Sequence, residues 1–220
     1  METYVLVHGG NMSTKTWNKL SGQKISTEDG HMGARYWDGT VNALEAAGHR
    51  VFAPTLTDEF TSNLTDHIHQ ICALIVENNL QDIILVGHSY GGFVITGVAD
   101  QMPERIRFLV YLDSALPDPG QSLIDILQMA YPPEEDAPEL PDMNPPYVEK
   151  IQYDPKRIQG LKKIYILCTK SEFNDISHFA KEKIDAAKGG WTYFELPSSH
   201  VPMADLPDDF YKLLLNIPEL

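Results

Sequence analysis

The chain has 220 residues, of which 43% are hydrophobic and 22% charged, and this length and balance are typical of a single globular domain with a substantial core. Its formal net charge of −14 at pH 7 argues against binding to nucleic acid or to an anionic membrane surface, since both would repel it. The two cysteines, Cys72 and Cys168, lie in apolar stretches, so we expect buried free thiols and no disulfide framework.

The first residues do not resemble a signal peptide, because the apolar run at residues 4–7 is too short. No apolar run approaches the roughly 20 residues that a membrane-spanning helix needs. We therefore expect a cytoplasmic location and no membrane partner.

Short apolar runs alternate along the chain with helical patterns, which is the arrangement of a parallel sheet flanked by helices. The predicted strands are residues 4–7, 50–53, 83–86, 106–112, 163–168 and 191–196. The predicted helices are residues 36–47, 66–78, 93–102, 122–130, 173–187 and 208–215. The sequence thus predicts one α/β domain over residues 1–220, with a mainly parallel sheet of about six strands.

Two segments do not fit this alternation. Residues 11–33 are polar and contain glycines, and they are long for a strand-to-helix connection, so we predict an inserted loop. Residues 114–158 contain no predicted strand, and residues 131–147 are too rich in proline and acidic residues for a core helix. We predict that residues 114–160 form a short proline-rich cap over the carboxyl ends of the strands; the alternative is a surface linker with no role.

The predicted strand at residues 83–86 leads directly into Gly87-His88-Ser89-Tyr90-Gly91. This sequence fits the pattern G-x-S-x-G between a strand and a helix, which is the context of a nucleophile elbow. Such a turn lifts the serine Oγ above the sheet, and glycines two residues on either side let strand and helix approach each other. The pattern favours Ser89 as a catalytic nucleophile.

A serine hydroxyl needs a general base, and the base needs an orienting acid. Of the eight histidines, only His178 and His200 follow Ser89, and His178 falls within a predicted helix. His200 lies in the loop after the last predicted strand, where its side chain can reach over the edge of the sheet. We therefore predict His200 as the base.

The acid is predicted to be Asp113, which ends the strand that should lie beside the elbow strand after a right-handed crossover. Glu172 is the main alternative, and Asp175 a weaker one, both from the region after the strand at residues 163–168. Asp113 could also have a structural role alone.

Attack on a carbonyl creates an oxyanion that needs fixed hydrogen-bond donors. We expect these donors to be the backbone N–H groups of Tyr90 and Gly10, the latter from the His8-Gly9-Gly10 loop after the first strand. Four residues could line an acyl pocket, Trp37, Met129, Tyr131 and Tyr147, although packing in the core explains aromatic residues equally well.

His67 and His69 do not predict a metal site, since residues two apart on a helix point to different faces and no further ligands lie nearby. We expect no metal and no cofactor.

Taken together, these motifs resemble the α/β-hydrolase superfamily, and in particular its small-lid group of plant methylesterases, hydroxynitrile lyases and bacterial esterase-like proteins. The resemblance implies the α/β-hydrolase fold and covers most of the chain outside the cap and residues 11–33. The matching pieces are Val5-Leu6-Val7-His8-Gly9-Gly10, the stretch from Trp37 to Gly48-His49-Arg50-Val51, Gly87-His88-Ser89-Tyr90-Gly91-Gly92, Leu109-Val110-Tyr111-Leu112-Asp113 and His200.

Two departures from the group are informative. The plant members carry their acid in the loop after the strand matching residues 163–168, where this chain has Lys170-Ser171-Glu172; the Tyr-Leu-Asp ending at Asp113 resembles a bacterial subset instead. The lyases carry a lysine directly after the catalytic histidine, and here that residue is Val201. A hydroxynitrile lyase is therefore not expected.

The predicted function is that of a carboxylesterase-like serine hydrolase, cleaving a small carboxylic ester, thioester or lactone through an acyl-enzyme on Ser89. Two alternatives stay open, a non-hydrolytic ligand receptor or carrier on the same fold and a lyase that uses the same triad. The sequence determines neither the substrate nor the oligomeric state.

Overall fold

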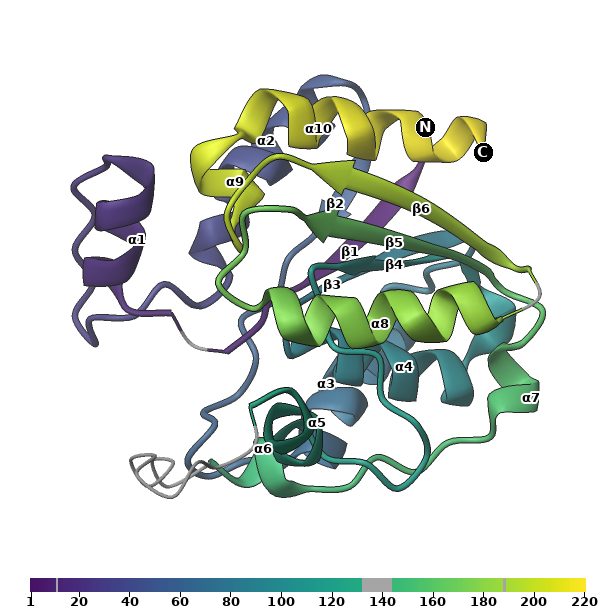
Figure 1. Cartoon of the computed structure of the whole chain (residues 1–220). Helices are drawn as coiled ribbons and strands as arrows, with labels where there is room; N and C mark the ends of the chain where they lie inside the picture. Colours follow the sequence, from purple (N-terminus) through teal and green to yellow (C-terminus); the bar gives the residue numbers. More distant parts are fainter. Residues whose placement is uncertain (11, 132–143, 188) are drawn as a thin grey trace, which may run out of the picture.

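Six parallel strands form one sheet in the order β2-β1-β3-β4-β5-β6 in the computed structural model, which describes residues 1–10, 12–131, 144–187 and 189–220 (Figure 1). The strands are β1 (Thr3–Val7), β2 (Arg50–Phe52), β3 (Ile83–His88), β4 (Ile106–Leu112), β5 (Lys162–Cys168) and β6 (Trp191–Leu196). Each neighbouring pair runs parallel. The predicted α/β fold with about six mainly parallel strands is confirmed.

Helices cover both faces of the sheet. They are α1 (Thr14–Ser21), α2 (Asp38–Ala46), α3 (Leu64–Glu77), α4 (Gly91–Gln101), α5 (Leu123–Ala130), α6 (Pro145–Val148), α7 (Pro155–Ile158), α8 (Asn174–Ala186), α9 (Pro202–Asp205) and α10 (Pro207–Asn216). Figure 1 shows α2, α9 and α10 on one side and α3, α4 and α8 on the other.

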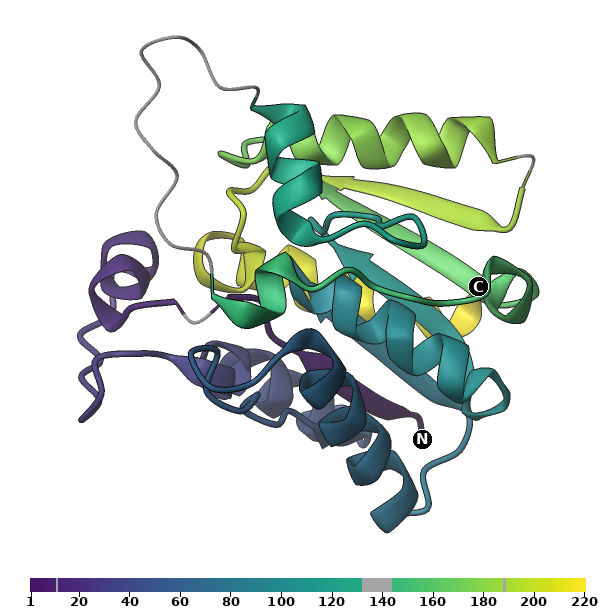
Figure 2. The ribbon, with the colours of Figure 1, turned by 90° about the horizontal axis from the view of Figure 1, so that it is seen from below.

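The core has two layers because successive side chains of a strand point to opposite faces of the sheet. Val5 and Leu85 are buried in the layer that contains α3, α4 and α8. Tyr4 and Ile84 are buried in the layer with α2 and α10. Covered faces on both sides explain why the strands read as unbroken apolar runs. The carboxyl ends of the strands all point to one edge of the sheet (Figure 2), and the loops at this edge carry the candidate catalytic residues.

The segment predicted as an inserted loop contains a helix, so the absence of regular structure there was a wrong expectation. Helix α1 begins after Ser13, whose side chain accepts a hydrogen bond from the Thr16 N–H, and it ends at Gly22 with φ 70°. Its polar sequence buries only Trp17, which is why hydrophobic periodicity gave no signal. The helix predicted from residue 36 is split into a 3₁₀ turn, Gly33–Trp37, followed by α2.

Within residues 114–160, helix α5 follows the prediction, with Ser122 and Asp125 forming a capping box at its N-terminus. The short helices α6 and α7 were not predicted. Residues 132–143, which hold most of the proline-rich stretch, lie outside the described residues. The division into one domain with a cap stays a prediction. Both cysteines are buried and free, as expected, and no helix among the described residues is long and apolar enough to cross a membrane.

Candidate active site

Ser89 lies on a sharp turn between β3 and α4 and has a left-handed backbone, with φ 54°. A residue other than glycine is strained in this region. The turn is closed by tightly packed glycines: a Cβ on Gly87 would lie 2.6 Å from the Gly91 carbonyl oxygen, and a Cβ on Gly91 would lie 2.7 Å from the Val7 carbonyl oxygen. The backbone here therefore has the geometry expected for a nucleophile elbow, with no room for side chains at the two flanking positions.

Asp113 and His200 meet at the carboxyl edge of the sheet. Asp113 directly follows β4, which is hydrogen-bonded to the elbow strand β3, and it has φ 41°. His200 lies in the loop between β6 and α9. Its Nδ1 is 2.7 Å from Asp113 Oδ2, with the carboxylate fully buried and the imidazole 12% exposed. This bond leaves Nε2 of the imidazole as the atom able to accept a proton.

Further donors hold the Asp113 carboxylate. Its Oδ1 accepts from the Cys168 N–H at 3.2 Å and from the Ser177 hydroxyl at 2.9 Å. Burial on its own raises the pKa of Asp113, but the hydrogen bond and charge of His200, with further bonds from Ser171 and Cys168, outweigh burial and hold the pKa below its usual value. Asp113 is therefore ionised at neutral pH and can stabilise a positive charge on His200.

The alternative acids do not share this environment. Glu172 is exposed, and among the described residues no hydrogen bond or ion pair joins its carboxylate to His200. Its backbone carbonyl accepts a bond from the Tyr131 hydroxyl at 3.4 Å. Asp175 is exposed in the first turn of α8.

One cavity of about 230 Å³ brings the candidate residues together. Its lining includes Ser89, Asp113 and His200, and also both residues predicted as oxyanion donors, Gly10 and Tyr90. The remaining wall is apolar and comes from α5, α6 and α8 and from residues that precede α5 and α8: Ala115, Leu123, Leu127, Tyr147, Phe173 and Ile176. The Phe173 ring stands edge-on to His200 with the centroids 4.6 Å apart.

Buried side chains hold the loop after β1 in place through hydrogen bonds. Gly9 N–H donates to the Tyr36 hydroxyl, which in turn donates to Nδ1 of His88 at 3.0 Å. Because the Gly9 N–H is used in this way, the next backbone N–H along the loop, that of Gly10, is the candidate oxyanion donor. His8 donates from Nδ1 to the Gly9 carbonyl and accepts at Nε2 from the Leu56 N–H, each at 2.8 Å.

His88 joins this loop to the loop of His200. Its Nε2–H donates to the His200 carbonyl at 2.7 Å, so one chain of hydrogen bonds runs from Gly9 through Tyr36 and His88 to His200. Burial, followed by the nearby charge of His200, lowers the pKa of His88 to about 3. Burial also lowers the pKa of His8 to about 4. Both imidazoles are therefore neutral at pH 7.

Of the four residues suggested for the acyl pocket, Tyr147 lines the cavity, whereas Trp37, Met129 and Tyr131 lie elsewhere, which corrects the hypothesis for these three. Trp37 is completely buried in the core layer on the opposite face of the sheet, where it stacks on Phe210 at 6.3 Å. Met129 and Tyr131 are 54% and 41% exposed, and neither lines the cavity. Helix α5 faces the cavity with Leu123 and Leu127, and Met129 is two residues further on, about 200° around the helix.

His67 and His69 separate as their spacing predicts. His67 is buried and accepts from the Tyr90 hydroxyl at Nδ1, while its Nε2–H donates to the Thr57 carbonyl, both at 2.9 Å. His69 is exposed. Among the described residues, no group of three or more His, Cys, Asp or Glu side chains is placed to hold a metal ion.

Sequence reasoning missed several residues of the site. Ser177 and Ser171 carry no motif, and only the fold brings them to Asp113. His8 and His88 stood within recognised motifs, and this was the one available signal that they matter. Tyr36 was visible only as part of a predicted helix.

Comparison with known proteins identifies the family. A profile of the alpha/beta hydrolase family matches residues 4–155. The chain is 31% identical to a carbendazim hydrolyzing esterase from a Nocardioides strain, over 97% of this chain and 98% of that protein. It is 28% identical to polyneuridine aldehyde esterase from Rauvolfia serpentina, over 54% of this chain but only 41% of that protein.

Solved structures share the fold. An extracellular alpha/beta-hydrolase from a Paenibacillus species superposes with a TM-score of 0.71 at 19% identity, over 98% of both chains. The family profile, the esterase relative over the full length and the fold agree. The chain therefore belongs to the alpha/beta hydrolase family and is a carboxylesterase-like hydrolase.

Proposed function

We propose that the chain is a serine hydrolase that cleaves a small carboxylic ester, thioester or lactone through an acyl-enzyme on Ser89. In this mechanism the Ser89 Oγ attacks the carbonyl carbon while His200 Nε2 takes the hydroxyl proton. The backbone N–H groups of Gly10 and Tyr90 stabilise the oxyanion. His200 then gives its proton to the leaving alcohol or thiol, and Asp113 stabilises the imidazolium between the two transfers.

The second half of the reaction repeats these steps with water. His200 takes a proton from a water molecule, which attacks the acyl carbon, and the Ser89 oxygen leaves with that proton. No cofactor takes part, because every proton and charge is handled by these side chains and backbone donors.

One observation carries the proposal: the 2.7 Å contact between His200 Nδ1 and the buried Asp113 Oδ2 lies in the wall of the cavity to which Ser89 also belongs. A solvent-exposed His–Asp contact would mean little. Here the acid is fully buried and held by two further donors, which fixes the tautomer that the base requires.

The cavity limits the acyl group. An apolar cavity of about 150 Å³ is sufficient for benzene, so a volume of about 230 Å³ suits an acyl portion of about six to eight carbons. We expect hydrolysis of p-nitrophenyl esters to be fastest at or below this length and to fall sharply by about twelve carbons. Carbendazim belongs in the substrate panel, since the relative that matches over the full length is named for its hydrolysis.

A fluorophosphonate probe tests the nucleophile. Labelling should map to the peptide that carries Ser89 and should be lost in Ser89→Ala. Ser26→Ala is a matched control, since Ser26 is exposed in the segment after α1, and it should label like the wild type. Labelling that persists in Ser89→Ala would refute the assignment.

Labelling combined with the ester panel and with ¹⁸O-labelled water separates the alternatives. A receptor or carrier with an intact triad would be labelled but would hydrolyse no ester of the panel. A hydrolase adds an oxygen atom from water to the carboxylic acid product. A lyase consumes no water, so ¹⁸O from solvent water would not enter its products. A cytoplasmic location stays a prediction, to be checked by fractionation of the producing cell.

A further inference from the structure

A second cavity, of about 290 Å³, lies on the α4–α8 face of the sheet and shares no lining residue with the cavity of Ser89. Its walls come from α4, β4, the segment 116–118, α7 and its flanking residues, β5, α8 and β6. We call it the α4–α8 cavity. It is slightly larger than the candidate catalytic cavity, and the catalytic mechanism makes no use of it.

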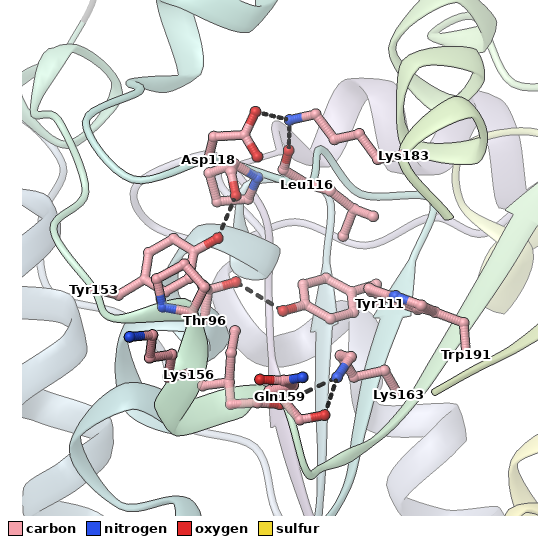
Figure 3. Close-up of a pocket in the computed structure, with 13 residues that line it drawn as sticks. Thr96, Tyr111, Leu116, Asp118, Tyr153, Lys156, Gln159, Lys163, Lys183 and Trp191 are labelled. Carbon is pink, nitrogen blue, oxygen red and sulfur yellow. Dashed lines mark hydrogen bonds and ion pairs between the residues drawn. The ribbon is translucent and has the colours of Figure 1, made fainter. Parts of the chain in front are cut away.

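Aromatic rings form one part of its wall. Tyr111 and Trp191 lie together with their ring centroids 5.5 Å apart, and Tyr153 stands across from them (Figure 3). The Tyr111 hydroxyl is bonded to Thr96 at 2.8 Å, and the Tyr153 hydroxyl donates to the Pro117 carbonyl at 2.9 Å. Both hydroxyls are bonded, so the aromatic lining is ring surface, mainly of the half-buried Tyr153 and Trp191 with Tyr111 packed behind, and it suits an apolar or aromatic occupant.

Among the charged residues of the lining, positive charge predominates. Lys156, Lys163 and Lys183 line the α4–α8 cavity against a single acid, Asp118, in a chain whose net charge is −14. The Lys163 ammonium is held by three backbone carbonyls at 3.1–3.3 Å and lies 5.7 Å from the centre of the Trp191 ring. Burial lowers the pKa of Lys163, and a negative charge in the cavity would offset this effect.

Lys183 provides a place for that negative charge. Its Nζ donates to the Leu116 carbonyl at 2.7 Å and pairs with Asp118 at 2.9 Å (Figure 3). The Asp118 side chain is 60% exposed and that of Lys183 33%. An ion pair this exposed contributes little to stability, so an incoming carboxylate can take the place of Asp118 on Lys183 at small cost.

We infer that the α4–α8 cavity binds a small aromatic monocarboxylate, with its ring among Tyr111, Tyr153 and Trp191 and its carboxylate on Lys183 in exchange for Asp118. Residues 116–118, which form part of this wall, begin three positions after Asp113, so the site lies close to the candidate triad in the chain. The binding itself does not depend on the proposed hydrolysis, and each can fail without the other.

The test is a titration with benzoate, followed by the indole N–H signals in ¹H–¹⁵N NMR spectra of the full chain. Trp191 is assigned from its absence in Trp191→Phe; Trp17 and Trp37 lie in the other core layer and serve as internal references, so the readout reports this cavity and not the cavity of Ser89. Benzoate should shift the Trp191 signal in a saturable manner, and benzyl alcohol, which lacks the charge, should bind at least tenfold more weakly.

Two variants with opposite effects make the test decisive. Lys183→Gln should weaken benzoate binding at least tenfold, whereas Asp118→Asn should tighten it severalfold because the competing carboxylate is gone. Lys181→Gln, on the same helix but paired with Asp185, should leave the affinity unchanged. An unmoved Trp191 signal at 20 mM benzoate, or equal affinity of Lys183→Gln and wild type, or weaker binding by Asp118→Asn, would each overturn the inference.

Discussion

Replacing Asp113 with asparagine changes one carboxylate oxygen into an NH₂ group, and the structure determines which one. The Oδ1 position accepts hydrogen bonds from the Cys168 N–H and the Ser177 hydroxyl. The amide oxygen of asparagine must take this position, because the opposite orientation would leave the buried Cys168 N–H without an acceptor, at about 1–3 kcal/mol. The NH₂ group then faces Nδ1 of His200.

Two N–H donors cannot face each other, so His200 must turn Nδ1 into an acceptor and carry its proton on Nε2. In this tautomer the imidazole cannot accept a proton from Ser89. In serine proteases the corresponding asparagine variant loses about 10⁴ in kcat. We therefore expect Asp113→Asn to lower kcat by about 10³–10⁴, or about 4–5.5 kcal/mol of transition-state stabilisation, with KM little changed.

The assay is steady-state hydrolysis of a short p-nitrophenyl ester by Asp113→Asn and by Glu172→Gln, with circular dichroism to check that both fold. Glu172 is exposed, so its variant should keep kcat within about twofold. If Asp113→Asn keeps more than a tenth of the activity while Glu172→Gln loses most of it, Glu172 is the acid and the reasoning from the hydrogen bonds of Oδ1 is refuted.

Three further outcomes follow from the packing around the site. Tyr36→Phe leaves Gly9 N–H and His88 Nδ1 buried without partners, which should lower the free energy of unfolding in urea by about 2–4 kcal/mol; a change below 0.5 kcal/mol would contradict this. Gly9→Ala puts a Cβ 2.7 Å from the Ser89 Cβ and should abolish ester hydrolysis while the chain still folds. Because His8 and His88 have folded-state pKa values of about 4 and 3, below about 6.5 in the unfolded chain, the unfolded state binds more protons as pH falls from 6.5 toward 4. The free energy of unfolding should therefore drop by about 1.4 kcal/mol per pH unit for each histidine, and a flat profile from urea titrations at pH 4.5, 5.5 and 6.5 would refute their neutrality.

The strands were predictable because burial on both faces leaves an unbroken apolar run, and each predicted end lies within two residues of the observed one. The elbow was predictable for a different reason: its glycines are required by backbone contacts below 3 Å, which no other residue tolerates. Helix α1 was not predictable from periodicity, since it buries one side chain.

The acid could be ranked from the sequence but not determined. Asp113 and the loop of Glu172 follow adjacent strands, since Leu112 pairs with Ile166 in the sheet. Chain order brings both carboxylates to the same edge, and only the direction of each side chain separates them. The groups that donate to Asp113 Oδ1 belong to Cys168 and Ser177, more than 50 positions further along the chain. No local sequence pattern could therefore predict them.

The pocket hypothesis was right for Tyr147 and wrong for its other three residues, because it selected residues by type instead of by their position around the helix. The apolar face of residues 122–130 was recognised from Leu123 and Leu127, and these two residues do line the cavity. Met129 lies on the same helix but points away from that face, and it does not line the cavity. Trp37 was chosen as a large aromatic residue, but its side chain is completely buried in the core.

His8 and His88, the two histidines within the recognised motifs, have a structural role that the motifs alone do not reveal. Neither His8 nor His88 lines the cavity, yet each is buried and bonded at both ring nitrogens. A neutral imidazole donates at one edge and accepts at the other, so His88 can join the Tyr36 hydroxyl to the His200 carbonyl. Through Tyr36 this chain of bonds reaches Gly9, and it therefore connects the loop of the proposed oxyanion donor to the loop of the proposed base.

Catalytic groups must be held within about 0.5 Å of their working positions, and a single buried chain of hydrogen bonds constrains both loops together. A protonated His88 has no acceptor, so the Tyr36 hydroxyl could no longer donate to it. The low pKa that burial gives His88 keeps this acceptor in place at neutral pH.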